Sequence, residues 1–231
     1  MTAVQGVVFD KDGTLFDFAR TWEAWALAFL RRVAGCDQDV RALGERIGFD
    51  TVAARFEPDS IVIAGTPAEV ADALAPGLPG MSRTRMLDIL NEEAARAPQA
   101  EVVPLVPYLR DLQAKGLRLG VATNDAEAPA RAHLHNAGAL DLFDFVAGSD
   151  SGHGGKPAPG QLLAFCEAVA LDPASVLMVG DSTHDLFAGR AAGMRTAAVL
   201  TGLATAQTLQ PHATVVVDHI GHLPDWIAAQ S

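Results

Sequence analysis

Short apolar runs alternate with helix-length segments in the second half of this 231-residue chain. Apolar runs bounded by glycine or polar residues are typical of buried strands. Strands are predicted at residues 117–123, 145–147, 176–179, 196–200 and 215–217. Helices are predicted at about 105–115, 159–170, 185–192 and 223–229, and another follows the strand 117–123 and ends at about residue 137. Because such alternation produces a parallel sheet covered on both faces, we expect an α/β fold with a Rossmann-like, three-layer core.

One further strand is predicted at the start of the chain, from Val4 to Phe9. The alternation resumes only after residue 101, and the residues in between favour helices and loops. The simplest organisation is a core formed by residues 1–15 and 102–231, with residues 16–101 inserted after the first strand as a helical unit.

The sequence of the insertion predicts at least three helices. Apolar residues at steps of three and four indicate a helix over 18–33. Thr66-Pro67-Ala68-Glu69 combines a capping box with proline at the first helical position. Ser82 is a favourable N-cap for a helix that extends to about residue 96. The one strand-like run in the insertion is Ile61 to Ala64.

The chain carries 28 acidic and 17 basic residues, for a formal net charge of −11. Binding to nucleic acid or to an anionic membrane surface needs a basic footprint, so we expect neither partner. Cys36 and Cys166 form no CxxC pair and are expected to be buried free thiols. With no signal sequence and no stretch approaching ~18 apolar residues, we expect a cytoplasmic protein.

Polar residues follow four of the predicted strands, where a parallel sheet binds its ligands. These segments are Asp10-Lys11-Asp12-Gly13-Thr14, Thr123-Asn124, the loop 149–159 that contains Lys156, and Gly180 to Asp185. Carboxylates gathered at one edge repel each other unless a cation binds, and oxygen ligands favour Mg²⁺. A lysine and a threonine nearby suit phosphate oxygens, and a free carboxylate can attack phosphorus to give an aspartyl-phosphate.

These four segments resemble, in the same order, the four motifs of the haloacid dehalogenase (HAD) superfamily. Val8 to Leu15 is similar to the first motif, Thr123 to the second, Gly155-Lys156-Pro157 to the third, and Gly180-Asp181-Ser182 with Asp185 to the fourth. The insertion lies where this superfamily places its C1 helical cap. Within the superfamily, the chain most resembles the phosphoglycolate phosphatase-like group.

The resemblance implies a phosphatase that acts on a small anionic phosphomonoester, such as phosphoglycolate, with Mg²⁺ as cofactor. Asp10 would be the nucleophile and Asp12 the general acid and base. The implied phosphate-binding residues are Thr123, Asn124 and Lys156. The implied metal ligands are Asp10, the main-chain carbonyl of Asp12, Asp181 and Asp185. Asp185 would support the metal site.

The insertion is expected to set the substrate, because a cap closes over the active site. It contains no lysine, so the Schiff-base chemistry of a phosphonatase is not expected. Trp22 stands at about the place where the sugar-phosphate mutases carry a histidine, which counts against a mutase. Arg20 is the basic residue of the insertion nearest to the first motif and is a candidate to contact a substrate carboxylate or phosphate, and Trp22 is the second candidate for substrate specificity.

Two alternatives stay open at this point. A mutase or other phosphotransferase of the same superfamily would use the same motifs. A phospho-receiver or regulatory binding module would also combine acids, a threonine and a lysine on a parallel sheet, although it lacks the Asp-x-Asp-Gly-Thr pattern. His133, His135, His219 and His222 are interpreted as surface residues, and His184 as a spacer within the fourth motif. The sequence does not indicate the oligomeric state.

Overall fold

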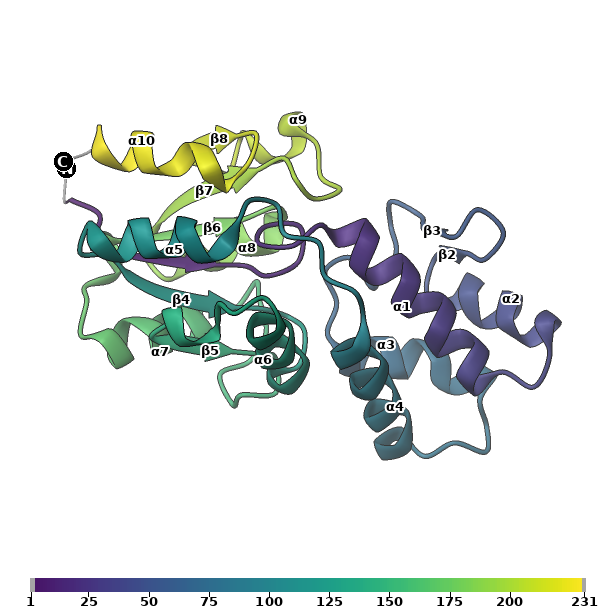
Figure 1. Ribbon diagram of the computed structural model, residues 1–231. Helices are drawn as coiled ribbons and strands as arrows, with labels where there is room; N and C mark the ends of the chain where they lie inside the picture. Colours follow the sequence, from purple (N-terminus) through teal and green to yellow (C-terminus); the bar gives the residue numbers. More distant parts are fainter. Residues whose placement is uncertain (1–2, 230–231) are drawn as a thin grey trace.

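Six parallel strands form the central sheet of the protein, whose computed structural model describes residues 3–229 (Figure 1). The strand order is β5-β4-β1-β6-β7-β8. The strands β4 and β5 therefore extend the sheet on one side of β1, and β6, β7 and β8 extend it on the other. The strands are β1 (Gly6–Phe9), β4 (Arg118–Ala122), β5 (Phe145–Ala147), β6 (Val176–Gly180), β7 (Arg195–Val199) and β8 (Val215–Val217). Each neighbouring pair is parallel, which confirms the predicted α/β fold.

Helices cover both faces of the sheet. Successive side chains of a strand point to opposite faces. Val7 therefore packs with α5 (Leu105–Ala114), α6 (Glu127–Asn136) and α10 (Leu223–Ala228), whereas Val8 packs with α7 (Gly160–Val169) and α8 (Thr183–Ala191). The described chain also forms α9 and four short 3-10 helices: α9 (Ala206–Leu209), η1 (Ala75–Gly77), η2 (Leu140–Leu142), η3 (Pro173–Ser175) and η4 (Ile220–His222).

The insertion folds around an apolar core of its own, beside the sheet (Figure 1). It contains, besides η1, four α-helices and one small hairpin: α1 (Phe18–Val33), α2 (Asp37–Arg46), β2 (Phe49–Asp50), β3 (Arg55–Phe56), α3 (Pro67–Leu74) and α4 (Arg83–Arg96). Trp25 and Phe29 of α1 stack, with ring centroids 5.7 Å apart, and pack within this core. The predicted capping box at Thr66 and the predicted N-cap at Ser82 are both formed.

Two expectations about individual segments are wrong. Ile61 to Ala64 forms turns rather than a strand, because Ile63 N–H and Gly65 N–H donate to nearby carbonyls of the same segment instead of to a neighbouring strand. Cys36, at the start of α2, is exposed, while Cys166 is buried as expected. Within residues 3–229, none of the helices has the length and apolar character needed to cross a membrane.

The two segments that connect the insertion to the sheet are hydrogen-bonded to each other. Asp17 N–H donates to Ala100 C=O (2.8 Å), and Val102 N–H donates to Leu15 C=O (3.0 Å). The chain therefore enters and leaves the insertion at one place, just beyond the carboxyl end of β1. This placement sets the insertion against the edge of the sheet where the motif residues lie.

Candidate active site

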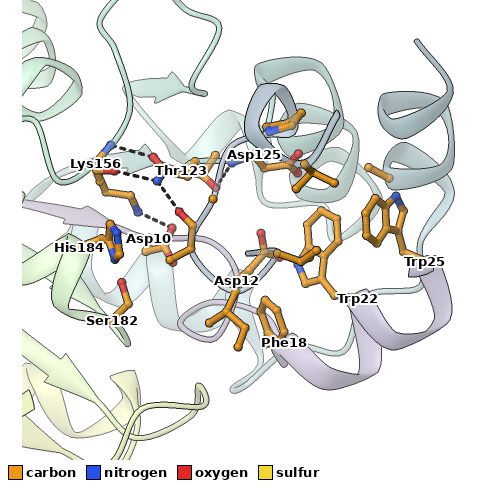
Figure 2. A pocket seen from close by; sticks show the side chains of 18 of the residues that line it. Asp10, Asp12, Phe18, Trp22, Trp25, Thr123, Asp125, Lys156, Ser182 and His184 are labelled. Atoms are coloured by element: carbon orange, nitrogen blue, oxygen red, sulfur yellow. Dashed lines mark hydrogen bonds and ion pairs between the residues drawn. The ribbon is translucent and has the colours of Figure 1, made fainter. Parts of the chain in front are cut away.

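The central strands bring the motif residues to one edge of the sheet. Asp10, Thr123 and Asp181 directly follow β1, β4 and β6, which are neighbours in the sheet. Asp10 N–H continues the ladder by donating to Val179 C=O at 2.8 Å, so the backbone that carries the Asp10 carboxylate is fixed. Lys156 reaches the same place from the loop after β5 (Figure 2).

Lys156 bridges two carboxylates in the interior of the site. Its Nζ lies 2.7 Å from Asp10 Oδ1 and 2.6 Å from Asp185 Oδ1, and all three residues are buried. Burial raises the pKa of Asp10 to about 7, with Asp185 and Asp12 adding to the rise and Lys156 opposing it. Burial alone would lower the pKa of Lys156, but the carboxylates of Asp10 and Asp185 raise it above its usual range, so this lysine stays charged.

Asp10, Asp181 and Asp185 form a buried cluster in which one oxygen from each lies within 4.8 Å of the others. The start of α8 aims Asp185 into the cluster, because its Oδ2 accepts from the Ser182 backbone N–H (3.0 Å) and hydroxyl (2.7 Å) in a capping box. Burial and the two neighbouring carboxylates raise the pKa of Asp181 well above its ordinary value. Three carboxylates against one lysine leave an excess of negative charge, so the donor set fits a divalent cation.

Two glycines make room for Asp181. A Cβ atom at Gly13 or at Gly202 would overlap the Asp181 carboxylate. Gly13 also has φ +77°, a conformation that side chains other than glycine rarely adopt. The glycine of the first motif is therefore required both by the turn and by the close approach of Asp181.

A second buried cluster lies beside Asp12 and centres on Lys11. The sequence predicted no role for this lysine. Lys11 is fully buried, and its Nζ lies 2.7 and 2.6 Å from the two carboxylate oxygens of Asp12. The same Nζ is 3.4 Å from Asp125 Oδ2, 3.1 Å from His133 Nδ1 and 5.4 Å from the centre of the Trp22 ring. Lys11 thus fixes the orientation of the Asp12 carboxylate, the group expected to transfer protons.

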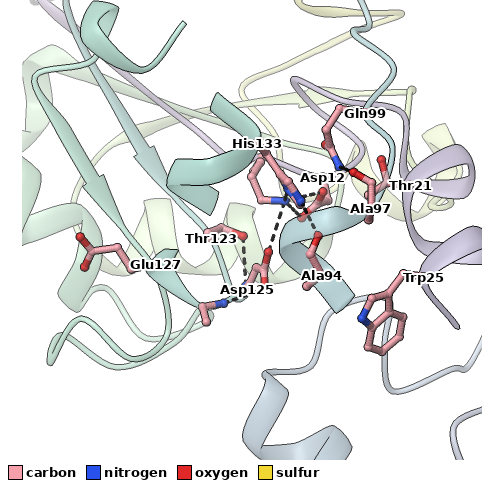
Figure 3. Close-up of polar contacts among 12 residues, drawn as sticks. Asp12, Thr21, Trp25, Ala94, Ala97, Gln99, Thr123, Asp125, Glu127 and His133 are labelled. Atoms are coloured by element: carbon pink, nitrogen blue, oxygen red, sulfur yellow. Dashed lines mark hydrogen bonds and ion pairs between the residues drawn. The ribbon is translucent and has the colours of Figure 1, made fainter. Parts of the chain in front are cut away.

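His133 connects this cluster to the insertion, so its interpretation as a surface residue is wrong. It is fully buried on α6, and its Nε2 lies 2.7 Å from the carbonyl oxygen of Ala94 in α4 (Figure 3). Burial, with the nearby charge of Lys11, lowers the pKa of His133 to about 4. The neutral ring can then donate from Nε2 to Ala94 and accept from Lys11 at Nδ1.

Asp125 is the second acid of this cluster, and it was not predicted from the sequence. Burial raises its pKa to about 6, Lys11 opposes the rise and Asp12 adds to it. Its position two residues after Thr123, at the end of a buried strand, is the one signal that could have marked it. Nothing local marks His133, because it contacts Lys11 from 122 residues away in the chain.

The two residues predicted to follow β4 as phosphate ligands differ in this structure. Thr123 lines the pocket, and its hydroxyl accepts from Asp125 N–H at 3.1 Å, which leaves the hydroxyl proton available. Asn124 has no such freedom: its Nδ2 donates to Ala64 C=O (2.8 Å) and Lys156 C=O (2.9 Å), and its Oδ1 accepts from Lys156 N–H (2.8 Å). Both donor hydrogens of the Asn124 side chain therefore hold backbone carbonyls, and phosphate binding by Asn124 stays a prediction.

A pocket opens between the sheet edge and the insertion. Asp10, Asp12, Thr123 and Lys156 line the sheet side. In the view of Figure 2, Asp12 lies between Asp10 and the aromatic side chains of α1, among them Trp22. Arg20, predicted as a substrate contact, is exposed and does not line the pocket, because it lies on the outward face of α1.

Comparisons with known proteins agree with this geometry. The phosphoglycolate phosphatase of Cereibacter sphaeroides (strain ATCC 17025) is 33% identical over 228 residues, which cover 95% of this chain and 96% of that protein. The N-acetylmuramic acid 6-phosphate phosphatase of Pseudomonas putida is 29% identical over 221 residues, with 94% and 92% covered. The crystal structure of CbbY from Rhodobacter sphaeroides in complex with phosphate shares the fold, with a TM-score of 0.68, 19% identity, and 95% and 96% covered.

The model of one family, the haloacid dehalogenase-like hydrolases, matches residues 4–193. This range includes the insertion and every motif residue discussed above. The chain therefore belongs to the haloacid dehalogenase-like hydrolase family.

Proposed function

We propose that this protein is a Mg²⁺-dependent phosphatase that hydrolyses small phosphomonoesters through an aspartyl-phosphate on Asp10. One observation carries the proposal: the buried carboxylate of Asp10, at the end of β1, lies 2.7 Å from the buried, charged Lys156, and Asp12 lines the same pocket. The relatives named as phosphatases support this reaction class. Phosphoglycolate is the anionic substrate that the sequence predicts.

The residues that would hold Mg²⁺ are Asp10, Asp181, Asp185 and the main-chain carbonyl of Asp12. When bound, the ion supplies positive charge that offsets the crowded carboxylates and the phosphoryl oxygens. The three buried carboxylates within 4.8 Å of one another support this assignment. Lys156 and the Thr123 hydroxyl supply the remaining donors for the phosphoryl group.

In the first half of the reaction, a carboxylate oxygen of Asp10 attacks phosphorus and the bond from phosphorus to the ester oxygen breaks. Asp12 in its protonated form gives its proton to the leaving oxygen. In the second half, Asp12 takes a proton from water as the water oxygen attacks phosphorus. The bond to Asp10 then breaks, which releases phosphate and restores the Asp10 carboxylate and the Asp12 proton.

We further propose that residues 16–101 act as a cap on a catalytic core formed by residues 1–15 and 102–231. The insertion supplies one wall of the pocket and contacts the core through His133 and Asn124. A closed wall of this kind excludes bulk water from the phosphoryl group until the leaving group has departed.

The test is release of phosphate from p-nitrophenyl phosphate with Mg²⁺ and with a chelator. Asp10→Asn keeps the shape of the side chain and removes the nucleophile, so we expect a loss of at least roughly a thousandfold in kcat. Asp141→Asn is the matched control, because Asp141 is exposed in η2, before the amino end of β5. Full activity of Asp10→Asn, or activity unchanged by the chelator, would contradict the proposal.

A further inference from the structure

We infer that the leaving group of the substrate is uncharged and presents an apolar face to the insertion. This inference rests on the proposed phosphatase function and narrows it, because it disfavours substrates whose leaving group carries a carboxylate. The phosphoryl group sits at the sheet edge, so the leaving group must occupy the part of the pocket that the insertion forms.

The wall supplied by the insertion is mostly apolar and includes aromatic side chains. Its side chains include Phe18, Trp22, Val62, Ile63, Val70 and Leu90. Phe18, Trp22, Val70 and Leu90 are each less than one-tenth exposed, so they are fixed by the packing of the insertion. Contact with this wall removes apolar surface of the leaving group from water, and this burial stabilises the bound substrate.

No cation of the insertion, all of whose residues the structure describes, lines the pocket. Its arginines lie elsewhere: Arg20 is exposed, and Arg32 and Arg83 form surface ion pairs with acids of the insertion. A substrate carboxylate on this side would be removed from water with no cation of the insertion to pair with it, which is strongly unfavourable.

The cations on the core side do not change this result. Lys156 already bridges Asp10 and Asp185 at the phosphoryl end. Lys11 is fully buried behind the pocket and is held by Asp12. His184 lines the pocket next to Ser182, on the sheet side of the view in Figure 2. An anionic leaving group would instead face the acids Asp12 and Asp125.

Two buried polar atoms on the apolar wall lack a hydrogen-bond partner. They are Nε1 of Trp22, on α1, and Oδ1 of Asn91, on α4, and both residues line the pocket. One is a donor and the other an acceptor, and a neutral hydroxyl group can satisfy either. Buried polar groups of native proteins are nearly always paired, so these two atoms point to a ligand that carries hydroxyl or similar neutral polar groups.

The experiment compares kcat/KM for matched substrates in saturating Mg²⁺. One pair is phosphoglycolate and 2-hydroxyethyl phosphate, and the other is 4-carboxyphenyl phosphate and 4-(hydroxymethyl)phenyl phosphate. Within each pair, the leaving groups have similar basicity and differ in charge. We expect the neutral member to be favoured by at least about tenfold in both pairs.

Two variants test whether the insertion causes the preference for a neutral leaving group. Val62 is half-buried on the pocket wall, so Val62→Lys adds a cation there, and we expect the ratio to move toward the anionic members by about tenfold. Arg20→Gln is the control and should leave both ratios unchanged, because Arg20 does not line the pocket.

The outcomes separate this inference from the proposed function. Hydrolysis of both members of a pair at equal rates, or a preference for the anionic member, overturns the inference and leaves the phosphatase function standing. A selective loss of phosphoglycolate hydrolysis in Arg20→Gln also overturns the inference. Failure to hydrolyse any of the four esters overturns the phosphatase function, and the inference falls with it.

Discussion

The buried environment of Lys11 shows how single residues fix the position of the Asp12 carboxylate. The role proposed for Asp12 requires its carboxylate to exchange a proton, and both of its oxygens lie within 2.7 Å of the Lys11 Nζ. His133 and Asp125 complete the surroundings of that lysine. Because the lysine is held from several sides, its position and that of Asp12 are set together by the packing of the core against the insertion.

His133 gives this cluster a measurable dependence of stability on pH. Its pKa in the folded protein is about 4, below the 6.5 of a free histidine. As the pH falls below 6.5 the unfolded chain takes up a proton that the folded chain refuses, so stability is lost between pH 6.5 and about 4. Urea unfolding should show that the free energy of unfolding of the wild type, relative to His133→Gln, falls by about 2–3 kcal/mol between pH 7 and pH 4.

The comparison with His133→Gln isolates the histidine. Asp125, whose pKa is raised to about 6, acts in the opposite direction, since its contribution to stability is lost as the pH rises through that value. Both proteins keep Asp125, so its contribution cancels to first order. Stability curves for the two proteins that run parallel from pH 7 to pH 4 would show that His133 is not held neutral.

At the scale of elements, the sequence predicted what depends on a local period and missed what depends on tertiary contact. The steps of three and four over residues 18–33 and the capping box at Thr66 are local, and α1 and α3 form where they were predicted. The hairpin of β2 and β3 has two residues in each strand, too few to show a period. The contact between Lys11 and His133 joins residues 122 positions apart in the chain, so no pattern near either residue predicts it.

The same contrast applies to the motif residues. Asp10, Thr123 and Asp181 could be placed together because the carboxyl ends of neighbouring parallel strands share one edge. The contacts that Asn124 makes in this structure could not be predicted, because they depend on where residue 64 of the insertion docks.

The loop after β7 offers a prediction at this scale, because its Gly202 approaches Asp181 at the end of β6. Gly202→Ala would place a methyl group on the Asp181 carboxylate and force one of them to move. We expect the Mg²⁺ concentration for half-maximal activity to rise by about tenfold or more, since displaced metal ligands bind less well.

Gly80→Ala is the matched control for this change. A Cβ atom at Gly80 meets nothing within 4 Å, and its φ lies outside the left-handed region. It should leave the Mg²⁺ requirement at the wild-type value. An unchanged requirement in Gly202→Ala would mean that Asp181 does not have to hold its present position for metal binding.

At the scale of the whole molecule, the pocket is complete only while the insertion stays on the core, because both units line it. The connecting segments fix the entry point, and two contacts beyond them tie the units together: His133 to Ala94, and Asn124 to Ala64. Asn124 is the more direct link to catalysis, because the same amide also holds the backbone of Lys156. One side chain thus couples the position of the insertion to the position of Lys156, the lysine proposed to bind phosphate.

Asn124→Ala removes that coupling without removing any charged group. We expect amide hydrogen exchange to speed up in residues 60–66, where the insertion loses its anchor, and kcat/KM to fall by about 10–100-fold because Lys156 is less well positioned. Gln99→Ala is the control, because Gln99 bonds only within the connecting segment, to Ala97 and Pro98. Faster exchange without loss of activity would show that the insertion can loosen while Lys156 stays in place, and the two units would then act independently.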